Sequence, residues 1–312
     1  MKENMSPKVR KRIFKDDTVA VYTMIAPMLI GFILFTLYPI FWIIRYSVFE
    51  YDGFTKPIFV GAYNFIRVFT RDMNYWQSLG NSFILTIALV LIQVPLGLVI
   101  AVMIKNKSRA NSFLRTAYFI PTIISTAIIG IIFSIMFSSF GGIINNILMN
   151  VGLIHAPIDW FAEKWHSMSV IIMAAIWSGI GITMIYFLMG LQSIPQELYE
   201  CADIDGANHI QKFFKITVPM LAPILQIVLM LAIIDGMKMT DLILVLTNGM
   251  PGGKTEVVMT YTYKFFFGAD GMNGATASQF GYASAMSVVT AVVVGLITLI
   301  YLKMSQKMKK IY

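Results

Sequence analysis

NSFILTIALVLIQVPLGLVIAVMI, residues 81–104, is the stretch of this chain that restricts its fold most. It contains no charged side chain. About 20 consecutive apolar residues cross the ~30 Å hydrocarbon core of a bilayer, so the stretch predicts a transmembrane helix. The whole chain has the same character, because 57% of its 312 residues are hydrophobic and 13% are charged. Soluble domains carry about 25% charged residues, so we expect an all-α membrane protein.

Five more apolar segments of similar length are bounded by polar or Gly/Pro-rich stretches. We therefore expect six transmembrane helices, at about 18–48, 81–104, 117–137, 168–191, 221–246 and 282–302. Prolines inside these spans are acceptable, because neighbouring helices can satisfy the freed carbonyl groups. The chain divides accordingly into a basic tail, a first span with its extracytoplasmic loop, a core of five spans and a second basic tail, over 1–17, 18–80, 81–303 and 304–312.

Lys and Arg are distributed unequally between the two predicted sides of the membrane. Both tails and the loops after the second and fourth spans together carry 16 of them, whereas the other three loops carry 6. Positive loops stay in the cytoplasm, so both termini are predicted to be cytoplasmic. The net charge of +8 follows from this topology, and we expect lipid around the spans and no nucleic-acid partner.

The predicted cytoplasmic loop between the fourth and fifth spans has an unusual pattern of helix signals. It reads SIPQELYECADIDGANHIQKFFKITVP, residues 193–219. Ser193 can cap a first short helix, Gly206 permits a chain reversal, and Asn208 can cap a second short helix. Pro219 limits that second helix and sets the entry of the next span. Two short helices with a tight corner form a rigid projection, which suits docking into a groove on a partner.

This loop resembles the EAA loop in permease subunits of binding-protein-dependent ABC importers. The family pattern is E-A-A-x-x-D-G-A followed by F, I, L-P and a later P. Here Cys201 stands in place of Ala and Val218 in place of Leu, and both changes are small and apolar. By this resemblance, the residues that couple to the ATPase are Glu200, Cys201, Ala202, Asp205, Gly206 and Ala207.

Other segments resemble the carbohydrate-importer branch, similar to the maltose and glycerol-phosphate permeases. They share family-like patterns and occur at Phe59–Phe65, Tyr118–Pro121, Gly190–Tyr199 and Leu246–Pro251. The resemblance implies import of a sugar or oligosaccharide across a bacterial or archaeal cytoplasmic membrane. It also implies three kinds of partner: a second permease of the same fold, two ATP-binding cassette subunits, and an extracytoplasmic solute-binding protein that meets the outer loops, chiefly 247–280.

The chain lacks the residues that an enzyme of this class would need. Gly253-Lys254-Thr255 ends like a phosphate-binding loop, but Asn248 occupies the position of the first glycine. The single cysteine and the scattered histidines predict no metal site. We therefore expect no catalytic residue and no cofactor in this chain, with ATP and Mg²⁺ bound by the partner ATPase.

Three charged residues lie in the predicted fifth span, where each costs at least ~2.5–3.5 kcal/mol at a helix centre. Asp235, Lys238 and Asp241 are spaced i, i+3 and would share one helix face. They form either a self-neutralising ion-paired stripe against a neighbouring helix or part of the solute pathway, and Asp241 matches a recurrent family aspartate. Gln93 and Trp177 are further pathway candidates, although helix packing is the favoured explanation for both.

Two other classes of transporter remain open at this point. In an ion-coupled secondary transporter Asp235 and Asp241 would relay protons, but the 193–219 loop would then have no role. An ABC importer of a non-sugar solute would share every feature described above. A membrane-embedded enzyme would need an acid/base or metal constellation at membrane depth, and the sequence contains none.

Overall fold

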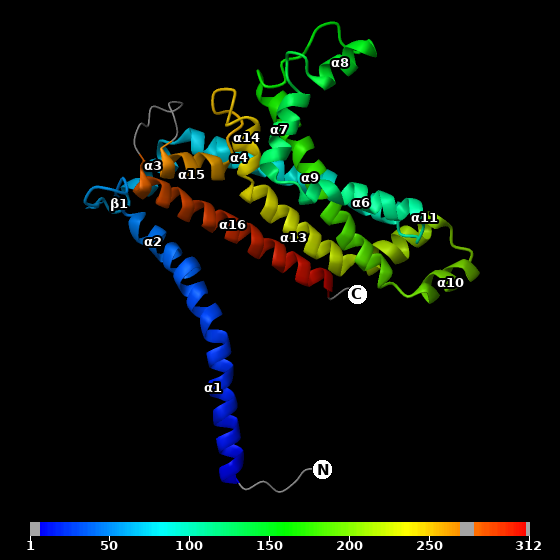
Figure 1. The fold of residues 1–312 in the computed structure, drawn as a ribbon, viewed down its shortest axis with the longest axis horizontal. Helices are drawn as coiled ribbons and strands as arrows, with labels where there is room; N and C mark the ends of the chain where they lie inside the picture. Colours follow the sequence, from blue (N-terminus) through cyan, green and yellow to red (C-terminus); the bar gives the residue numbers. More distant parts are fainter. Residues whose placement is uncertain (1–6, 269–277, 310–312) are drawn as a thin grey trace.

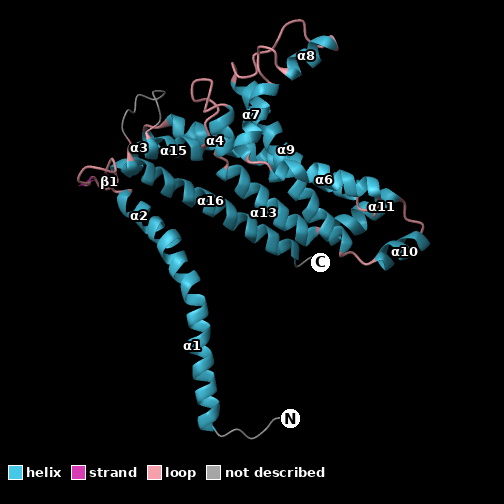
Figure 2. Ribbon diagram, viewed as in Figure 1, coloured by secondary structure: helices cyan, strands magenta, loops and turns pink. Residues whose placement is uncertain are grey.

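The computed structural model describes residues 7–268 and 278–309, with side chains described from 19 to 268 and from 278 to 305. Helices dominate this part of the chain, as Figures 1 and 2 show. The ends of both predicted tails and residues 269–277 of the predicted outer loop lie outside the described residues. The expectation of an all-α architecture is confirmed, apart from one small hairpin described below.

Four helical segments in the described part are long and apolar enough to cross a bilayer: Val19–Tyr46, Met73–Met103, Lys164–Gln192 and Phe280–Ser305. The first comprises the end of α1 (Pro7–Phe32) and α2 (Tyr38–Tyr46), and the second comprises α4 (Met73–Ala88) and α5 (Val94–Met103). The third is α9 (Lys164–Gln192), and the fourth is most of α16 (Phe280–Lys309).

A proline follows each of three π-helical turns by two residues. Pro39, Pro95 and Pro219 cannot donate a backbone hydrogen bond, and a proline ring clashes with the carbonyl four residues earlier in a regular helix. That carbonyl lies in the middle of the π turn each time, where the wider backbone makes room for the ring. The turns are Ile33–Leu37, Leu89–Gln93 and Phe213–Thr217.

Two further segments are long and apolar enough to cross a bilayer only if each is counted as a bent pair of helices. Counting both pairs gives up to six spans in the described part of the chain. α6 (Arg109–Ile123) and α7 (Thr126–Met136) meet at 100°, and the helical segment His209–Met220 meets α13 (Ala222–Lys238) at 69°. The expectation of one continuous helix over 117–137 is therefore wrong.

Packing accounts for the bend between α6 and α7. The Thr122 hydroxyl donates a hydrogen bond of 2.9 Å to the carbonyl of Ser178 on α9, which holds the end of α6. α7 also contacts α9 but packs mainly against α14 (Asp241–Leu246), where Gly130 lies against Val245. Hydrophobicity along the sequence carries no signal for such a change of neighbour.

The predicted fifth span, 221–246, is also not one helix. α13 ends at Lys238, Met239 is extended with φ −57° and ψ 124°, and α14 begins at Asp241. The second span differs in its start, because Asp72 caps α4 by accepting a hydrogen bond from the Tyr75 amide. That helix is eight residues longer at its start than the predicted 81–104.

Shorter elements gather at the two ends of the long helices. A two-stranded antiparallel hairpin, which pairs Phe49 with Phe59, lies beside α3 at the end where α16 begins (Figure 1). α10 and α11 lie at the opposite end. The bounds are β1 Phe49–Glu50, β2 Ile58–Phe59, α3 Tyr63–Thr70, α8 Ile143–Asn150, α10 Gln196–Ile204, α11 His209–Lys212, α12 Val218–Met220 and α15 Val258–Phe267.

Small residues let the long helices approach closely, as in other membrane bundles. A Cβ on Gly181 would lie 2.3 Å from the Tyr118 carbonyl oxygen of α6, and one on Gly97 would lie 2.5 Å from the Thr183 side chain of α9. The largest cluster of buried apolar side chains joins α4, α5, α7, α9, α13 and α14. The first span takes no part in this core, because its apolar window is 0% buried within the chain.

Gly181→Ala should destabilise the protein, because the added methyl group has no room against the backbone of α6. Overpacking of this kind costs about 1–3 kcal/mol. Gly295→Ala is the matched control, since Gly295 also lies in a span and its Cβ would meet nothing within 4 Å. Thermal unfolding in detergent should show a lower midpoint for Gly181→Ala and an unchanged or higher one for Gly295→Ala. Equal shifts would contradict the close helix approach.

Candidate functional site

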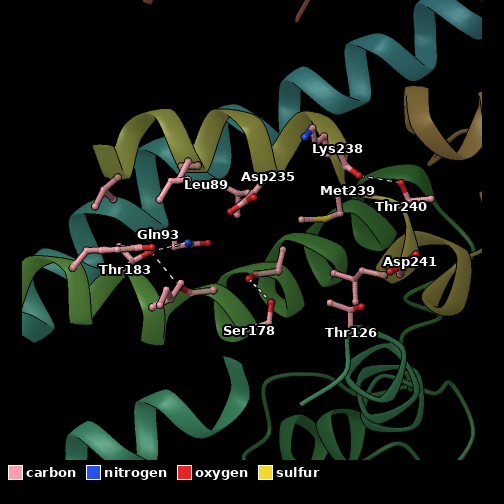
Figure 3. Close-up of a pocket in the computed structure, with 18 residues that line it drawn as sticks. Leu89, Gln93, Thr126, Ser178, Thr183, Asp235, Lys238, Met239, Thr240 and Asp241 are labelled. Atoms are coloured by element: carbon pink, nitrogen blue, oxygen red, sulfur yellow. Dashed lines mark hydrogen bonds between the residues drawn. The ribbon is translucent and has the colours of Figure 1, made fainter. Parts of the chain in front are cut away.

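A cavity of about 450 Å³ lies between the helices of the core, and we call it the central cavity. Figure 3 shows it bounded by α13 on one side and α9 on the other. The apolar part of its wall includes Leu89, Ala175 and Val228. Its polar lining comes from five separate segments and consists of Gln93, Thr126, Ser178, Thr183, Tyr186, Asp235, Lys238, Thr240 and Asp241.

Gln93 is buried at the end of the π turn that precedes Pro95. Its amide nitrogen donates a hydrogen bond of 2.9 Å to the Thr183 hydroxyl on α9 (Figure 3). Gly179 leaves the space for this amide group, because a Cβ at that position would lie only 2.8 Å from it. Gln93 therefore both packs two helices together and presents an amide to the cavity, so the two roles considered for it are compatible.

The three charged residues of the predicted fifth span all line the central cavity. Figure 3 shows Asp235 on the side of α13 that faces α9. All three are exposed, and the ion pairs found in the described part of the chain involve other residues. The break after Lys238 places Asp241 on a different helix, so the three residues do not share one helix face, and no ion pair joins them in the described part of the chain.

Trp177 is the one pathway candidate that does not line this cavity. Its ring centre lies 5.8 Å from that of Phe133, which makes it a packing residue between α9 and α7. Sequence reasoning in turn missed the hydroxyl groups of Thr126, Ser178 and Thr240. Isolated Ser and Thr residues are common in apolar helices, and only the arrangement of α7, α9 and α14 brings these three together.

A buried polar loop follows α14 beside this region. The Asn81 amide donates hydrogen bonds of 2.8 and 2.6 Å to the carbonyl groups of Lys254 and Glu256. The Glu256 carboxylate, only 3% exposed, forms an ion pair with Lys264. Such a loop is acceptable between helices only when its polar groups have partners. Asn81 therefore has the packing role that we expect of a buried amide.

The 193–219 loop lies at the end of the molecule opposite α3 and β1 (Figure 1). Its EAA-like residues share a short helix and the turn after it: Glu200, Cys201 and Ala202 lie on α10, and Asp205, Gly206 and Ala207 follow. Glu200, Cys201, Asp205 and Gly206 are exposed, and the two alanines are half-buried. Exposed apolar side chains accompany them, with Ile204 87% and Ile210 69% exposed.

The turn after α10 is a Schellman motif. The Ala207 amide donates to the Ala202 carbonyl at 2.9 Å, and the Gly206 amide donates to the Asp203 carbonyl at 3.1 Å. Gly206 has φ +74°, a conformation that suits glycine. The predicted chain reversal at Gly206 is thus confirmed.

One of the two predicted caps of this loop is confirmed and the other is wrong. Asn208 and Gln211 form a capping box, in which each side-chain oxygen accepts from the other residue's amide, at 2.8 and 2.9 Å. Ser193 does not cap α10, because its hydroxyl donates to the Gly190 carbonyl of α9 at 2.8 Å. Pro195 is extended and occupies the cap position instead.

Side-chain contacts join the loop to the helix that follows it. Lys212 and Asp203 form an ion pair between α11 and α10. The Tyr199 hydroxyl of α10 lies 2.9 Å from that of Thr217, which is buried at the end of the π turn. α12 and α13 follow Thr217 directly, so α10 is connected to the helix that carries Asp235 and Lys238.

Comparisons with known proteins agree with this architecture. Residues 93–310 match the family described as "Binding-protein-dependent transport system inner membrane component". The chain is 35% identical over 297 residues to the probable ABC transporter permease protein YesP of Bacillus subtilis, covering 95% of this chain and 93% of that protein. It is 32% identical over 300 residues to the arabinooligosaccharides transport system permease protein AraP of the same species, covering 95% and 92%.

A solved structure is similar as well. It belongs to a bacterial ABC transporter involved in the import of the acidic polysaccharide alginate, with a TM-score of 0.80, 25% identity and coverage of 95% of this chain and 99% of that one. The family match spans more than half of the chain, and the long apolar helices fit a membrane component. The chain therefore belongs to the inner-membrane permease subunits of binding-protein-dependent ABC importers.

Proposed function

We propose that this permease subunit forms half of the pathway of an ATP-driven importer whose solute is a sugar or oligosaccharide. The central cavity carries the proposal, because hydroxyl, amide and charged groups converge there inside an otherwise apolar helix bundle. Polar side chains at membrane depth mark solute pathways. The similarity to AraP, whose name gives arabino-oligosaccharides, supports a carbohydrate solute, and sugar hydroxyls would hydrogen bond to this lining.

We further propose six spans, with each bent helix pair counted as one and both termini in the cytoplasm. The excess of Lys and Arg in the tails and in two loops supports this orientation. The 193–219 loop would then face the cytoplasm. The hairpin, α3 and the described parts of 247–280 would face the opposite side, where an extracytoplasmic solute-binding protein docks.

The 193–219 loop is the proposed docking site for the ATPase. Its exposed Glu200, Cys201, Asp205 and Gly206 lie beside the exposed Ile204, a mixture of apolar and charged groups that suits a protein partner. ATP and Mg²⁺ would bind to two ATP-binding cassette subunits, one of which contacts this chain, and a second permease would complete the pathway.

Rigidity of the loop is what would let it transmit motion. The Schellman turn, the capping box and the Lys212–Asp203 pair fix α10 against α11. The Tyr199–Thr217 contact then joins α10 to the segment that leads into α13. A displacement of α10 by the closing ATPases would therefore move Asp235 and Lys238 relative to α9 and switch the side on which the central cavity opens.

The source of energy tests the proposed function directly. Proteoliposomes that contain the complete complex should import a labelled neutral oligosaccharide only when ATP is present on the side of the membrane that corresponds to the cytoplasm. A protonophore should leave the rate of uptake unchanged. A proton-coupled secondary transporter would lose uptake with the protonophore and would need no ATPase. Uptake by this chain and its partner permease alone would contradict the proposal.

Asp241→Asn should weaken solute transport without disturbing assembly. Asp241 lines the central cavity and is exposed, so its carboxylate is free to accept hydrogen bonds from a sugar. Loss of a charge-assisted hydrogen bond of about 1.5 kcal/mol corresponds to about a tenfold higher KM for uptake. Glu163→Gln, an exposed carboxylate outside the cavity, is the control. Normal uptake kinetics for Asp241→Asn would exclude Asp241 from the pathway.

Gly206→Val should uncouple transport from ATP hydrolysis. A β-branched residue is strained by about 1–2 kcal/mol at φ +74°, which distorts the Schellman turn. Gly141→Val provides a control with nearly the same strain, because Gly141 has φ +70° and an equally open Cβ position but lies outside the loop. ATP-driven uptake and recovery of the ATPase during purification should fall for Gly206→Val only. Equal losses for both variants would mean that the strain acts through general instability.

A further inference from the structure

A second cavity, of about 460 Å³, lies at the end of the molecule where β1, α3 and the start of α16 meet (Figure 1). We call it the hairpin cavity, because half of its lining residues belong to residues 50–58 of the hairpin. It shares no residue with the central cavity. α2 ends at Tyr46 and α16 begins at Phe280, and the two helices pack together. Both helices belong to segments that are long and apolar enough to cross a bilayer, so the cavity lies where these two candidate spans would leave the hydrocarbon.

Two carboxylates and two cations line this cavity: Glu50, Asp52, Lys56 and Arg67. Asp52 is held as a carboxylate, because the amides of Thr55 and Phe54 and the Thr55 hydroxyl all donate to its Oδ1 at 2.8–2.9 Å. These bonds lower the pKa of Asp52 to about 2, with the Thr55 amide contributing most. Its second oxygen has no such partner in the described part of the chain, so it can bind a cation.

Arg67 is fixed in its position on the wall. Its Nη1 donates to the Gln279 side-chain oxygen at 2.7 Å, and its guanidinium carbon lies 3.8 Å from the centre of the Tyr282 ring. Lys56 and Glu50 are exposed, and no hydrogen bond or ion pair of their side chains occurs among the described residues. The cavity thus offers positive and negative groups in equal number, with polar atoms free to meet a ligand.

The surroundings of the hairpin cavity are apolar. Beside it Phe54 is 91% exposed, Phe59 69% and Ile58 63%. Trp42 of α2 packs edge to face with Tyr51 and Phe280, and the rings of Tyr51 and Phe280 are tilted against each other, with all ring centres 6.0–6.2 Å apart. Aromatic residues of this kind are enriched at the membrane–water interface. A polar cavity among exposed apolar side chains is complementary to an amphiphile with a polar head.

We propose that the hairpin cavity binds the headgroup of a zwitterionic amino-phospholipid such as phosphatidylethanolamine. The phosphate would lie beside Arg67 and Lys56, and the ammonium group would lie beside Glu50 and Asp52. The acyl chains would follow the exposed apolar surface of α2. An anionic lipid without an amine would leave both carboxylates unpaired, and a saccharide would leave Phe54 and Phe59 in contact with water.

Native mass spectrometry of the purified importer complex, titrated with one lipid at a time, tests this site. Wild type should bind phosphatidylethanolamine about tenfold more tightly than phosphatidylglycerol. The double variant Glu50→Gln/Lys56→Gln should lose this preference, because it removes one charge of each sign without altering the net charge. Glu163→Gln/Lys107→Gln changes two exposed charges elsewhere and should keep it.

Three outcomes would overturn the proposal. Wild type and the Glu50→Gln/Lys56→Gln variant could bind phosphatidylethanolamine equally, which would place the lipid elsewhere. Phosphatidylglycerol could bind wild type as tightly, which would remove the role of the carboxylates. Maltotriose could bind to wild type and to the Glu163→Gln/Lys107→Gln control but not to the Glu50→Gln/Lys56→Gln variant, which would make the cavity a saccharide site. The lipid site does not rest on the proposed transport function, and either can fail alone.

Discussion

Hydrocarbon offers a peptide group no hydrogen-bond partner, and the structure of this chain depends on that constraint. Each span is helical because only a helix satisfies its own backbone within one segment. Ahead of Pro39, Pro95 and Pro219, the backbone widens into a π turn and remains helical. The same constraint decides where polar side chains go. Gln93 pairs with Thr183, Asn81 pairs with backbone carbonyls, and the unpaired charges face a cavity.

The same helices also explain how the proposed solute site and the proposed partner site would belong to one mechanism. In that mechanism the central cavity needs helices that can change their relative positions, whereas the 193–219 loop needs to stay rigid. The contacts follow this division, with a capping box, a Schellman turn and an ion pair in the loop. α13 connects the two regions, because the loop leads into its start and Asp235 and Lys238 lie near its end.

Much of this architecture could be predicted from the sequence, because it depends on local chemistry. The length of the apolar segments located the long helices, and the positive φ at position 206 favours a glycine. Asn208 followed by Gln211 is a capping-box pattern whose hydrogen bonds involve only neighbouring residues. The bends could not be predicted in this way. The chain turns after Ile123 and after Lys238 because the main neighbour changes, from α9 for α6 to α14 for α7, and from α4 for α13 to α7 for α14. A window of hydrophobicity contains no such information.

The same limit applies to the sites. Gln93, Asp235, Lys238 and Asp241 were recognisable because polar groups are costly in a membrane. The hydroxyls of Thr126 and Ser178 were not, since single Ser and Thr residues are common in apolar helices and only the fold assembles them. Trp177 is a conspicuous residue that packs against Phe133, which agrees with the helix-packing role considered for it.

The central claim is that the 193–219 loop takes its motion from an ATPase on the cytoplasmic side. Cys201 permits a direct measurement, because it is exposed on α10 and is the only cysteine in the chain. A membrane-impermeant thiol reagent should label it in inverted membrane vesicles and not in right-side-out vesicles, and the bound ATPase should protect it. Labelling from the outside, or labelling that the ATPase leaves unchanged, would contradict the account.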